Sequence, residues 1–181
     1  MEGQNRVGRS RVFTIGHGAR PAEELIGCLE AAGVRTLVDV RRFPSSRRHP
    51  QFHRAELAAA LAASGIAYRH EVELGGRRRG EPGEERFGCL ETPAFRSYAA
   101  RMGTPTWQEA LTRALAAERP CFLCAETLWW RCHRRLIAEL LAARGHDVVH
   151  ILRPHESQRH RLLDESEARS GKLYVCGALV A

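Results

Sequence analysis

Short apolar runs alternate along this chain with stretches whose apolar residues follow the helical period. The run at 12–15 is followed by a helical pattern over 21–32, and the run at 35–40 is followed by one over 56–63. This succession is typical of a parallel sheet with right-handed crossover connections. We therefore predict that the first part of the chain folds as two βα units.

The alternation continues in the second half of the chain. Two Thr-Pro pairs mark helix starts, because proline is well suited to the first helical position. Residues 74–83 are too rich in glycine and charge for a regular element and are predicted to form a loop. The further predicted elements are strand 66–70, helices 94–101 and 106–117, strand 120–124, helix 131–143 and strand 147–152.

The order of these elements predicts the α/β class, with a mostly parallel, Rossmann-like sheet that carries helices on both faces. A length of 181 residues fits one domain. We expect an N-terminal extension over 1–11, an α/β core domain over 12–153, and a C-terminal tail over 154–181. The tail is expected to pack a short strand, 172–175, on the core.

Composition is that of an ordinary globular chain, with 44% hydrophobic and 27% charged residues. No apolar stretch approaches the ~20 residues that span a bilayer, and the N-terminus lacks a signal-peptide pattern. We therefore expect a cytoplasmic protein with no membrane partner. The cysteines show no regular framework, so free thiols are expected at Cys28, Cys89, Cys121, Cys124, Cys132 and Cys176.

The formal charge of +7 is carried almost entirely by arginines. Three groups of arginines each follow a predicted strand. The C-terminal ends of parallel strands share one edge of the sheet, where ligands bind. These arginines would focus a positive potential there, which predicts a small anionic partner; a solvated surface that only aids solubility is the alternative. The groups are Arg41, Arg42, Arg47, Arg48 and Arg54, then Arg77, Arg78, Arg79 and Arg86, then Arg131, Arg134 and Arg135.

Cys132 is the best candidate for a nucleophilic or redox-active thiol. It would lie at the N-terminus of the helix predicted over 131–143, beside arginines, where the helix dipole favours a thiolate. His133 or His17 would serve as its base. A buried, unreactive cysteine is the structural alternative.

A metal site is a further alternative, suggested by the spacing of Cys121, Cys124, Cys132 and His133, with Cys124, Cys132 and His133 as the candidate ligands. Two features argue against it. Cys121 and Cys124 would face opposite sides of an extended strand, and adjacent residues such as Cys132 and His133 seldom chelate one ion together. We therefore predict no metal.

Asp39 and Arg41 point to the same side of a strand because side chains alternate with a period of two. They either satisfy one another as a buried pair, or Arg41 holds an anionic substrate while Asp39 orients a neighbour. Glu126 follows a strand end and has two readings as well, as a helix cap or as a general acid or base.

The loop Gly16-His17-Gly18 allows a ligand to approach the backbone closely and could hold a phosphate. The three-glycine dinucleotide fingerprint and the Walker motif are both missing from the sequence. No cofactor is therefore expected.

Several motifs together resemble a prokaryotic family, domain of unknown function 488. They are Thr14-Ile15-Gly16-His17, Leu37 to Arg41, Leu74-Gly75-Gly76, Phe95 to Ala99, Cys124-Ala125-Glu126, Cys132-His133-Arg134 and Val149 to Leu152, across roughly residues 12 to 175. The resemblance implies a compact α/β domain but no activity. It marks as signature positions His17, Asp39, Arg41, Gly75, Gly76, Tyr98, Cys124, Glu126, Cys132, His133 and Arg134.

These observations lead to three hypotheses. The first is an enzyme that acts on a small phosphorylated or otherwise anionic substrate, with nucleotide-derived compounds among the candidates. Cys132, His133, His17, Asp39 and Glu126 would be its catalytic residues, and Arg41, Arg42, Gly75, Gly76, Tyr98 and Arg134 would bind substrate. The others are a nucleic-acid-binding module that uses the arginine-rich edge, and a metal-binding or redox-sensing protein.

Overall fold

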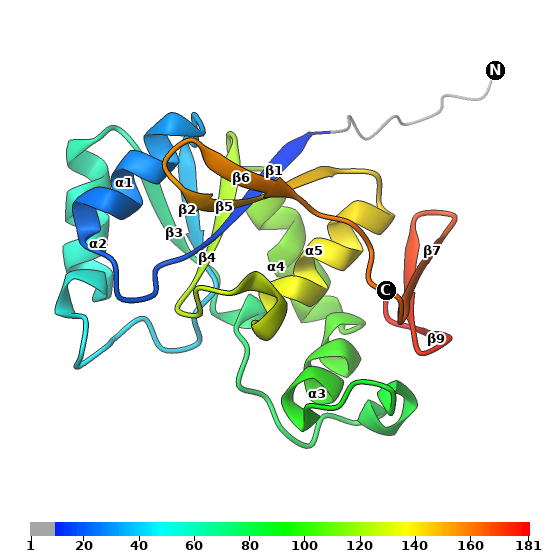
Figure 1. Cartoon of the computed structure of the whole chain (residues 1–181). Helices are drawn as coiled ribbons and strands as arrows, with labels where there is room; N and C mark the ends of the chain where they lie inside the picture. The colour runs from blue at the N-terminus through cyan, green and yellow to red at the C-terminus, as the bar shows by residue number, and fades with distance from the viewer. Residues whose placement is uncertain (1–9) are drawn as a thin grey trace.

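A computed structural model describes residues 10–181. Its main feature is a six-stranded sheet that lies between two sets of helices (Figure 1). The strands are β1 (Arg11–Gly16), β2 (Thr36–Asp39), β3 (Ala67–His70), β4 (Pro120–Cys124), β5 (Asp147–Arg153) and β6 (Glu156–Arg159). The helices are α1 (Ala22–Ala31), α2 (Arg54–Ala63), α3 (Pro93–Met102), α4 (Pro105–Leu115) and α5 (Arg134–Ala143).

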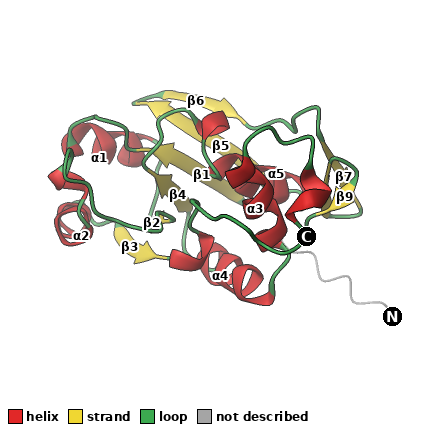
Figure 2. Ribbon diagram, turned by 90° about the horizontal axis from the view of Figure 1, so that it is seen from below, coloured by secondary structure: helices red, strands yellow, loops and turns green. Residues whose placement is uncertain are grey.

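Helices cover both faces of this sheet, as the sequence predicted. Alternate strand residues feed two separate cores: Phe13 and Ile15 pack on the α1 and α2 side, whereas Val12 packs on the α3, α4 and α5 side. Cys121 and Phe122 divide in the same way. Figure 2 shows α1 and α2 on one side of the strands and α4 and α5 on the other. The predicted α/β class with a mostly parallel sheet is therefore confirmed.

The strand order is β3-β2-β4-β1-β5-β6, and the first five strands are parallel. The classical dinucleotide-binding order places the first strand next to the second, whereas here β4 separates β1 from β2. The predicted Rossmann-like topology is therefore not confirmed. In this order the C-terminal ends of β1, β4 and β2 lie side by side, so the residues that follow these three strands can form one site.

The C-terminal residues form more regular structure than the predicted single strand. β6 returns antiparallel to β5 and extends the main sheet. Its four residues are all exposed, so the strand lacks the apolar alternation that would reveal it in the sequence. A second, antiparallel sheet contains β7 (Ser166–Arg169), β8 (Lys172–Val175) and β9 (Ala178–Leu179), and β8 packs Leu173 and Val175 into the larger core.

Two expectations about local structure are corrected. Cys89 and Cys176 form a disulfide between the loop before α3 and the C-terminal sheet, so only Cys28, Cys121, Cys124 and Cys132 are free. The helix predicted from residue 131 begins at Arg134, because Trp129–Arg131 form a separate 3₁₀ turn and Cys132 is extended, with φ −120° and ψ 151°. Cys132 therefore lies just before the helix rather than in its first turn.

None of the helices in the described part of the chain has the combination of length and apolar character that a membrane crossing requires.

Candidate active site

A pocket of about 1320 Å³ lies at the C-terminal ends of the central strands. Backbone hydrogen bonds fix its floor: the amide of His17 donates to the carbonyl of Cys124 at 2.9 Å, and the amide of Val40 donates to that of Leu123 at 3.0 Å. The residues that follow β1, β4 and β2 therefore lie close together at the pocket. The predicted site residues that line the pocket are His17, Arg41, Arg42, Gly76, Cys124, Glu126, Cys132 and His133.

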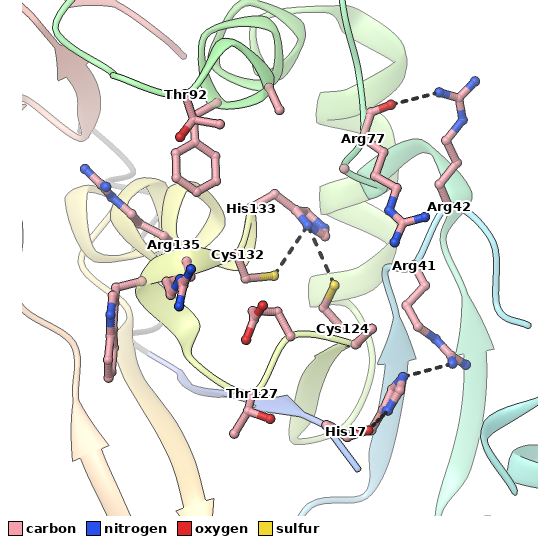
Figure 3. A pocket seen from close by; sticks show the side chains of 18 of the residues that line it. His17, Arg41, Arg42, Arg77, Thr92, Cys124, Thr127, Cys132, His133 and Arg135 are labelled. Atoms are coloured by element: carbon pink, nitrogen blue, oxygen red, sulfur yellow. Dashed lines mark hydrogen bonds between the residues drawn. The ribbon is translucent and has the colours of Figure 1, made fainter. Parts of the chain in front are cut away.

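Two thiols and one imidazole meet inside this pocket (Figure 3). Nδ1 of His133 lies 3.5 Å from Sγ of Cys132 and 3.8 Å from Sγ of Cys124. Cys124 ends β4 and Cys132 precedes α5, so two different segments supply the pair. Cys132 is 4% exposed, so a reagent reaches it only by entering the pocket.

The two thiols hold each other in different protonation states. Burial alone would raise the pKa of Cys132, but a hydrogen bond from Cys124 and the neighbouring His133 and Arg134 hold this pKa well below its ordinary value. The same hydrogen bond, together with burial, raises the pKa of Cys124 well above its ordinary value. These opposite pKa shifts favour a thiolate at Cys132, with Cys124 as the thiol that donates to it.

Packing fixes the orientation of His133. A Cβ built on Gly76 would lie 2.6 Å from Nδ1 of His133, so only glycine leaves room for the imidazole in this position. The Tyr98 ring meets the imidazole edge-on, with centroids 5.0 Å apart. Nε2 of His133 is buried and has no hydrogen-bond partner among the described residues. Contacts with its neighbours, rather than a hydrogen bond at Nε2, therefore hold this ring.

The same three side chains have the composition of a zinc site. All three ligand atoms lie within 4.8 Å of one another. In a tetrahedral zinc site, ordinary Zn–S and Zn–N lengths place sulfur and nitrogen ~3.6 Å apart, close to the two separations given above. The structure thus brings Cys124, Cys132 and His133 together as a candidate set of zinc ligands, although Cys132 and His133 are adjacent in the sequence.

Asp39 and Arg41 form a buried ion pair at the wall of this pocket, which Arg41 lines. Nη2 of Arg41 donates to Oδ2 of Asp39 at 2.6 Å, Nε donates to the same carboxylate, and the side chains are 5% and 0% exposed. Tyr68 donates its hydroxyl hydrogen to Oδ2 at 2.7 Å, and Nη1 of Arg41 donates to the carbonyl of Phe52 at 2.8 Å. Most hydrogen-bond donors of Arg41 are therefore occupied within the protein.

His17 is held as a neutral imidazole. Its Nδ1–H donates to the carbonyl of Gly18 at 2.8 Å, and Nε2 accepts from Nη1 of Arg41 at 3.3 Å. Its ring stacks on Phe52 with centroids 4.2 Å apart. Burial, with a further contribution from the charge of Arg41, lowers the pKa of His17 to about 4. An imidazole whose Nε2 is occupied in this way is a poor proton acceptor at neutral pH.

This environment predicts an acid-sensitive contribution to stability. Because the pKa of His17 falls from 6.5 to about 4 on folding, the unfolded chain binds a proton that the folded chain excludes between these values. The contribution is complete above pH 6.5 and is lost as pH falls towards 4. Urea unfolding across this range should show the wild type losing stability faster than His17→Gln, which cannot titrate. A constant difference between the two proteins would contradict the prediction.

Three predicted substrate-binding residues lie behind the pocket wall. Arg134 is 1% exposed and donates to Oγ1 of Thr14 at 3.2 Å and to the carbonyl of Glu126. The Tyr98 hydroxyl is buried and donates to the carbonyl of Leu74 at 2.7 Å. Gly75 packs against Arg42, where an added Cβ would lie 3.0 Å from the Arg42 Cα. These three residues shape the wall without lining the cavity.

Further arginines of the pocket lie on two sides of the thiols. Arg42 and Arg77 are on one side and Arg135 is on the other (Figure 3). Arg135 pairs with Glu165 of the C-terminal segment. Arg42, Arg77 and Arg131 line the pocket and form no ion pair with any carboxylate in the described part of the chain. These three residues are the best anion-binding candidates.

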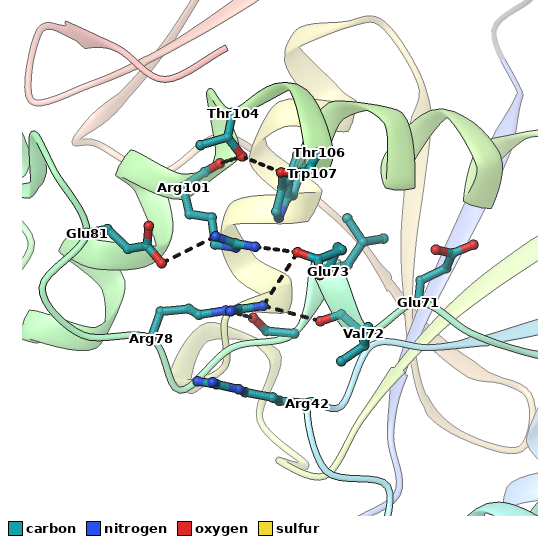
Figure 4. A network of polar contacts seen from close by, with 12 residues as sticks. Arg42, Glu71, Val72, Glu73, Arg78, Glu81, Arg101, Thr104, Thr106 and Trp107 are labelled. Carbon is teal, nitrogen blue, oxygen red and sulfur yellow. Dashed lines mark hydrogen bonds and ion pairs between the residues drawn. The ribbon is translucent and has the colours of Figure 1, made fainter.

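A polar network anchors the glycine-rich loop that follows β3 (Figure 4). Arg101 of α3 pairs with Glu73 and also with Glu81 at 3.5 Å. Arg78 donates to the carbonyl of Gly75 at 3.2 Å and lies 3.9 Å from Glu73. Arg78, which the sequence grouped with the anion-binding arginines, therefore fastens the loop instead of lining the pocket.

Sequence reasoning missed one whole side of the pocket. Glu91, Thr92 and Phe95, around the start of α3, and Glu165 of the C-terminal segment all line the cavity. They share no motif with the strand ends. Glu165 reaches the cavity through the return of the C-terminal segment, which the Cys89–Cys176 disulfide joins to the loop before α3, and the sequence carries no local signal for that return.

Comparison with curated proteins and with solved structures gives no match. The sequence model of a family described as domain of unknown function DUF488 matches residues 21–141. This span is narrower than the resemblance suggested. It contains Arg41, Gly76, Cys124, Cys132 and His133, while His17 lies just before it. The chain belongs to the DUF488 family.

Proposed function

We propose that this protein is an enzyme that acts on a small anionic substrate, such as a phosphorylated compound, with Cys132 as its nucleophile. One observation carries the proposal: the Cys132 sulfur lines the same pocket as Arg42, Arg77 and Arg131, whose charges are not neutralised by a described carboxylate. A pocket of this kind concentrates an anion beside a nucleophile.

The other groups have roles that follow from their positions. His133 contacts both sulfurs through Nδ1, so it is the proton carrier that the geometry favours. His17 is unsuited to that role, because its pKa of about 4 and its occupied Nε2 leave little basicity at neutral pH. Glu126 is exposed on the pocket wall and accepts from the amide of Leu128 at 3.3 Å. Its second carboxylate oxygen is available to accept a hydrogen bond or a proton from a bound substrate.

The proposed chemistry is substitution at an electrophilic atom of the substrate. The Cys132 thiolate supplies the electron pair of a new bond to sulfur, and the leaving group departs with the electrons of the broken bond. Arg42, Arg77 and Arg131 balance the charge of the bound anion. Because the attack starts from a thiolate, no base is needed to activate the sulfur, and His133 is the group that delivers a proton to the leaving group.

Alkylation with a matched pair of reagents tests this proposal. Iodoacetamide is neutral and iodoacetate is an anion of similar size, so their rate ratio at Cys132 reports anion capture. We expect Cys132 to react faster than a free thiol at neutral pH, and its iodoacetate-to-iodoacetamide ratio to exceed that of a free thiol. Arg42→Gln should lower this ratio severalfold. Arg169→Gln, which removes a distant exposed arginine, should not change it.

Peptide mapping assigns each modification, and Cys132→Ser should lose the fast site while remaining folded. Labelling that is no faster than a free thiol, or that begins only on unfolding, would make Cys132 structural and overturn the proposal. A fast reaction with an ordinary reagent ratio would remove the anionic substrate class and leave only the nucleophile.

Nucleic-acid binding is a second candidate, favoured by two exposed aromatic side chains on the pocket wall. Phe43 is 60% exposed and Trp130 is 44% exposed, and the Arg42 guanidinium lies 5.4 Å from the centre of the Phe43 ring. Such side chains stack on unpaired bases. This candidate requires oligonucleotide binding that weakens steeply with salt, survives Cys132→Ser and is lost in Arg42→Gln.

A further inference from the structure

The proposed mechanism leaves the second thiol of the pocket without a role. Cys124 lines the pocket beside Cys132, and their sulfurs lie within 4.8 Å of one another. We propose that Cys124 is the resolving thiol of a dithiol pair, and that the pocket reduces a small anionic disulfide. This inference rests on the proposed nucleophile, Cys132, and names the substrate class of the same site.

The placement of the free thiols isolates this pair. Cys28 and Cys121 belong to the core on the opposite face of the sheet. Cys89 is already bonded to Cys176. Among the described residues, Cys124 is therefore the only free thiol that shares the pocket with Cys132. An adduct formed on Cys132 has one intramolecular thiol within reach.

The surroundings of the pair suit disulfide exchange. A disulfide needs the two sulfurs at about 2.0 Å, so the side chains must rotate towards each other. Cys132 lies in extended backbone between a 3₁₀ turn and α5, outside any regular element. His133 contacts both sulfurs through one nitrogen, which allows it to accept the proton of Cys124 when that thiol attacks.

The reaction balances in two steps. Cys132 thiolate attacks one sulfur of the substrate, forms a mixed disulfide with it and releases the other half as a thiolate. Cys124 then loses its proton to His133 and attacks Sγ of Cys132, which forms the Cys124–Cys132 disulfide and releases the second half as a thiolate. The substrate gains two electrons and the protein loses two. A dithiol reductant from outside must restore the pair for another cycle.

The dianionic aromatic disulfide 5,5′-dithiobis(2-nitrobenzoate) is the probe, added in an equimolar amount to the full chain. Each half of the probe that leaves is a coloured thiolate, and mass spectrometry reports whether the other half remains attached to the protein. The wild type should release two thiolates per chain, retain no adduct and yield a peptide that joins Cys124 to Cys132. Cys124→Ser should release one thiolate and retain the other half on Cys132. Cys132→Ser should react much more slowly.

Each alternative result has a definite meaning. A wild-type adduct on Cys132 that persists would overturn the resolving role of Cys124 while leaving the proposed nucleophile intact. An unreactive Cys132 would overturn both proposals. Equal reactivity of Cys124 in the Cys132→Ser variant would reverse the assigned order and contradict the inference.

Zinc content of the purified protein provides an independent check. The dithiol inference requires less than one zinc ion per chain, and the same thiolate release with and without a chelator. One tightly bound zinc ion per chain, absent from both Cys124→Ser and Cys132→Ser, would overturn the inference, because both sulfurs would then be ligands.

Discussion

Asp39→Ala is expected to lower the free energy of unfolding by about 3–5 kcal/mol, the usual cost of leaving one partner of a buried ion pair unpaired. Asp39 is fully buried and receives hydrogen bonds from Nε and Nη2 of Arg41 and from the hydroxyl of Tyr68. Without this carboxylate, the Arg41 guanidinium remains charged and unpaired at a position where its side chain is only 5% exposed. Urea denaturation followed by tryptophan fluorescence would measure the loss.

The matched control removes a carboxylate from an exposed ion pair. Glu167 and Arg169 are each 56% exposed, and solvent weakens their attraction. Glu167→Ala should therefore leave the denaturation midpoint unchanged. If Asp39→Ala proved equally harmless, the Arg41 charge would have to find water or another partner. The buried pair would then not be what fixes Arg41 beside the pocket.

Gly16→Ala is expected to cost about 3 kcal/mol and also to disturb the thiols. A Cβ at this position would lie 2.0 Å from the carbonyl oxygen of Glu126 and 2.8 Å from Nη2 of Arg134. The first contact is with backbone, so the chain between Cys124 and Cys132 must move. Overpacking in a rigid interior typically costs a few kcal/mol. Denaturation midpoints and the Cys132 alkylation rate should fall together.

Gly27→Ala provides the comparison for the same chemical change. Gly27 lies within α1, and nothing within 4 Å would meet its added Cβ. Alanine is the better helix former by about 1 kcal/mol, so this variant should be as stable as the wild type or more stable, with unchanged alkylation. A stable Gly16→Ala variant with normal alkylation would show that the Glu126 carbonyl can move away at little cost.

The position of the pocket could be predicted from the sequence, because strands are recognised from local patterns of apolar residues. Strands ending at Gly16, Asp39 and Cys124 were recognisable from their apolar runs, and the carboxyl ends of parallel strands meet at one edge. The alternation of side chains also separated Cys121 from Cys124 correctly. These predictions needed only the period of a strand and the parallel direction of the chain.

Other features depended on partners far away in the chain. Arg134 and Tyr98 are polar residues in signature motifs, which suggested contact with a ligand, but each of them donates to a backbone carbonyl inside the protein. No local pattern distinguishes these two fates. The position of β4 between β1 and β2, and the disulfide between Cys89 and Cys176, follow equally from tertiary contacts.

The central strand β4 also constrains how this site can change. Cys124 is aligned with Gly16 of β1, and Leu123 is aligned with Asp39 of β2. A shift of β4 by one position would exchange its two faces. A shift that aligned Leu123 with Gly16 would turn the thiol towards the hydrophobic layer under α1 and place a leucine at the pocket instead. The presence of a thiol in the pocket thus depends on the parity of a strand of five residues. An insertion that leaves the alternation of β4 unchanged must therefore fall in the loop before or after this strand.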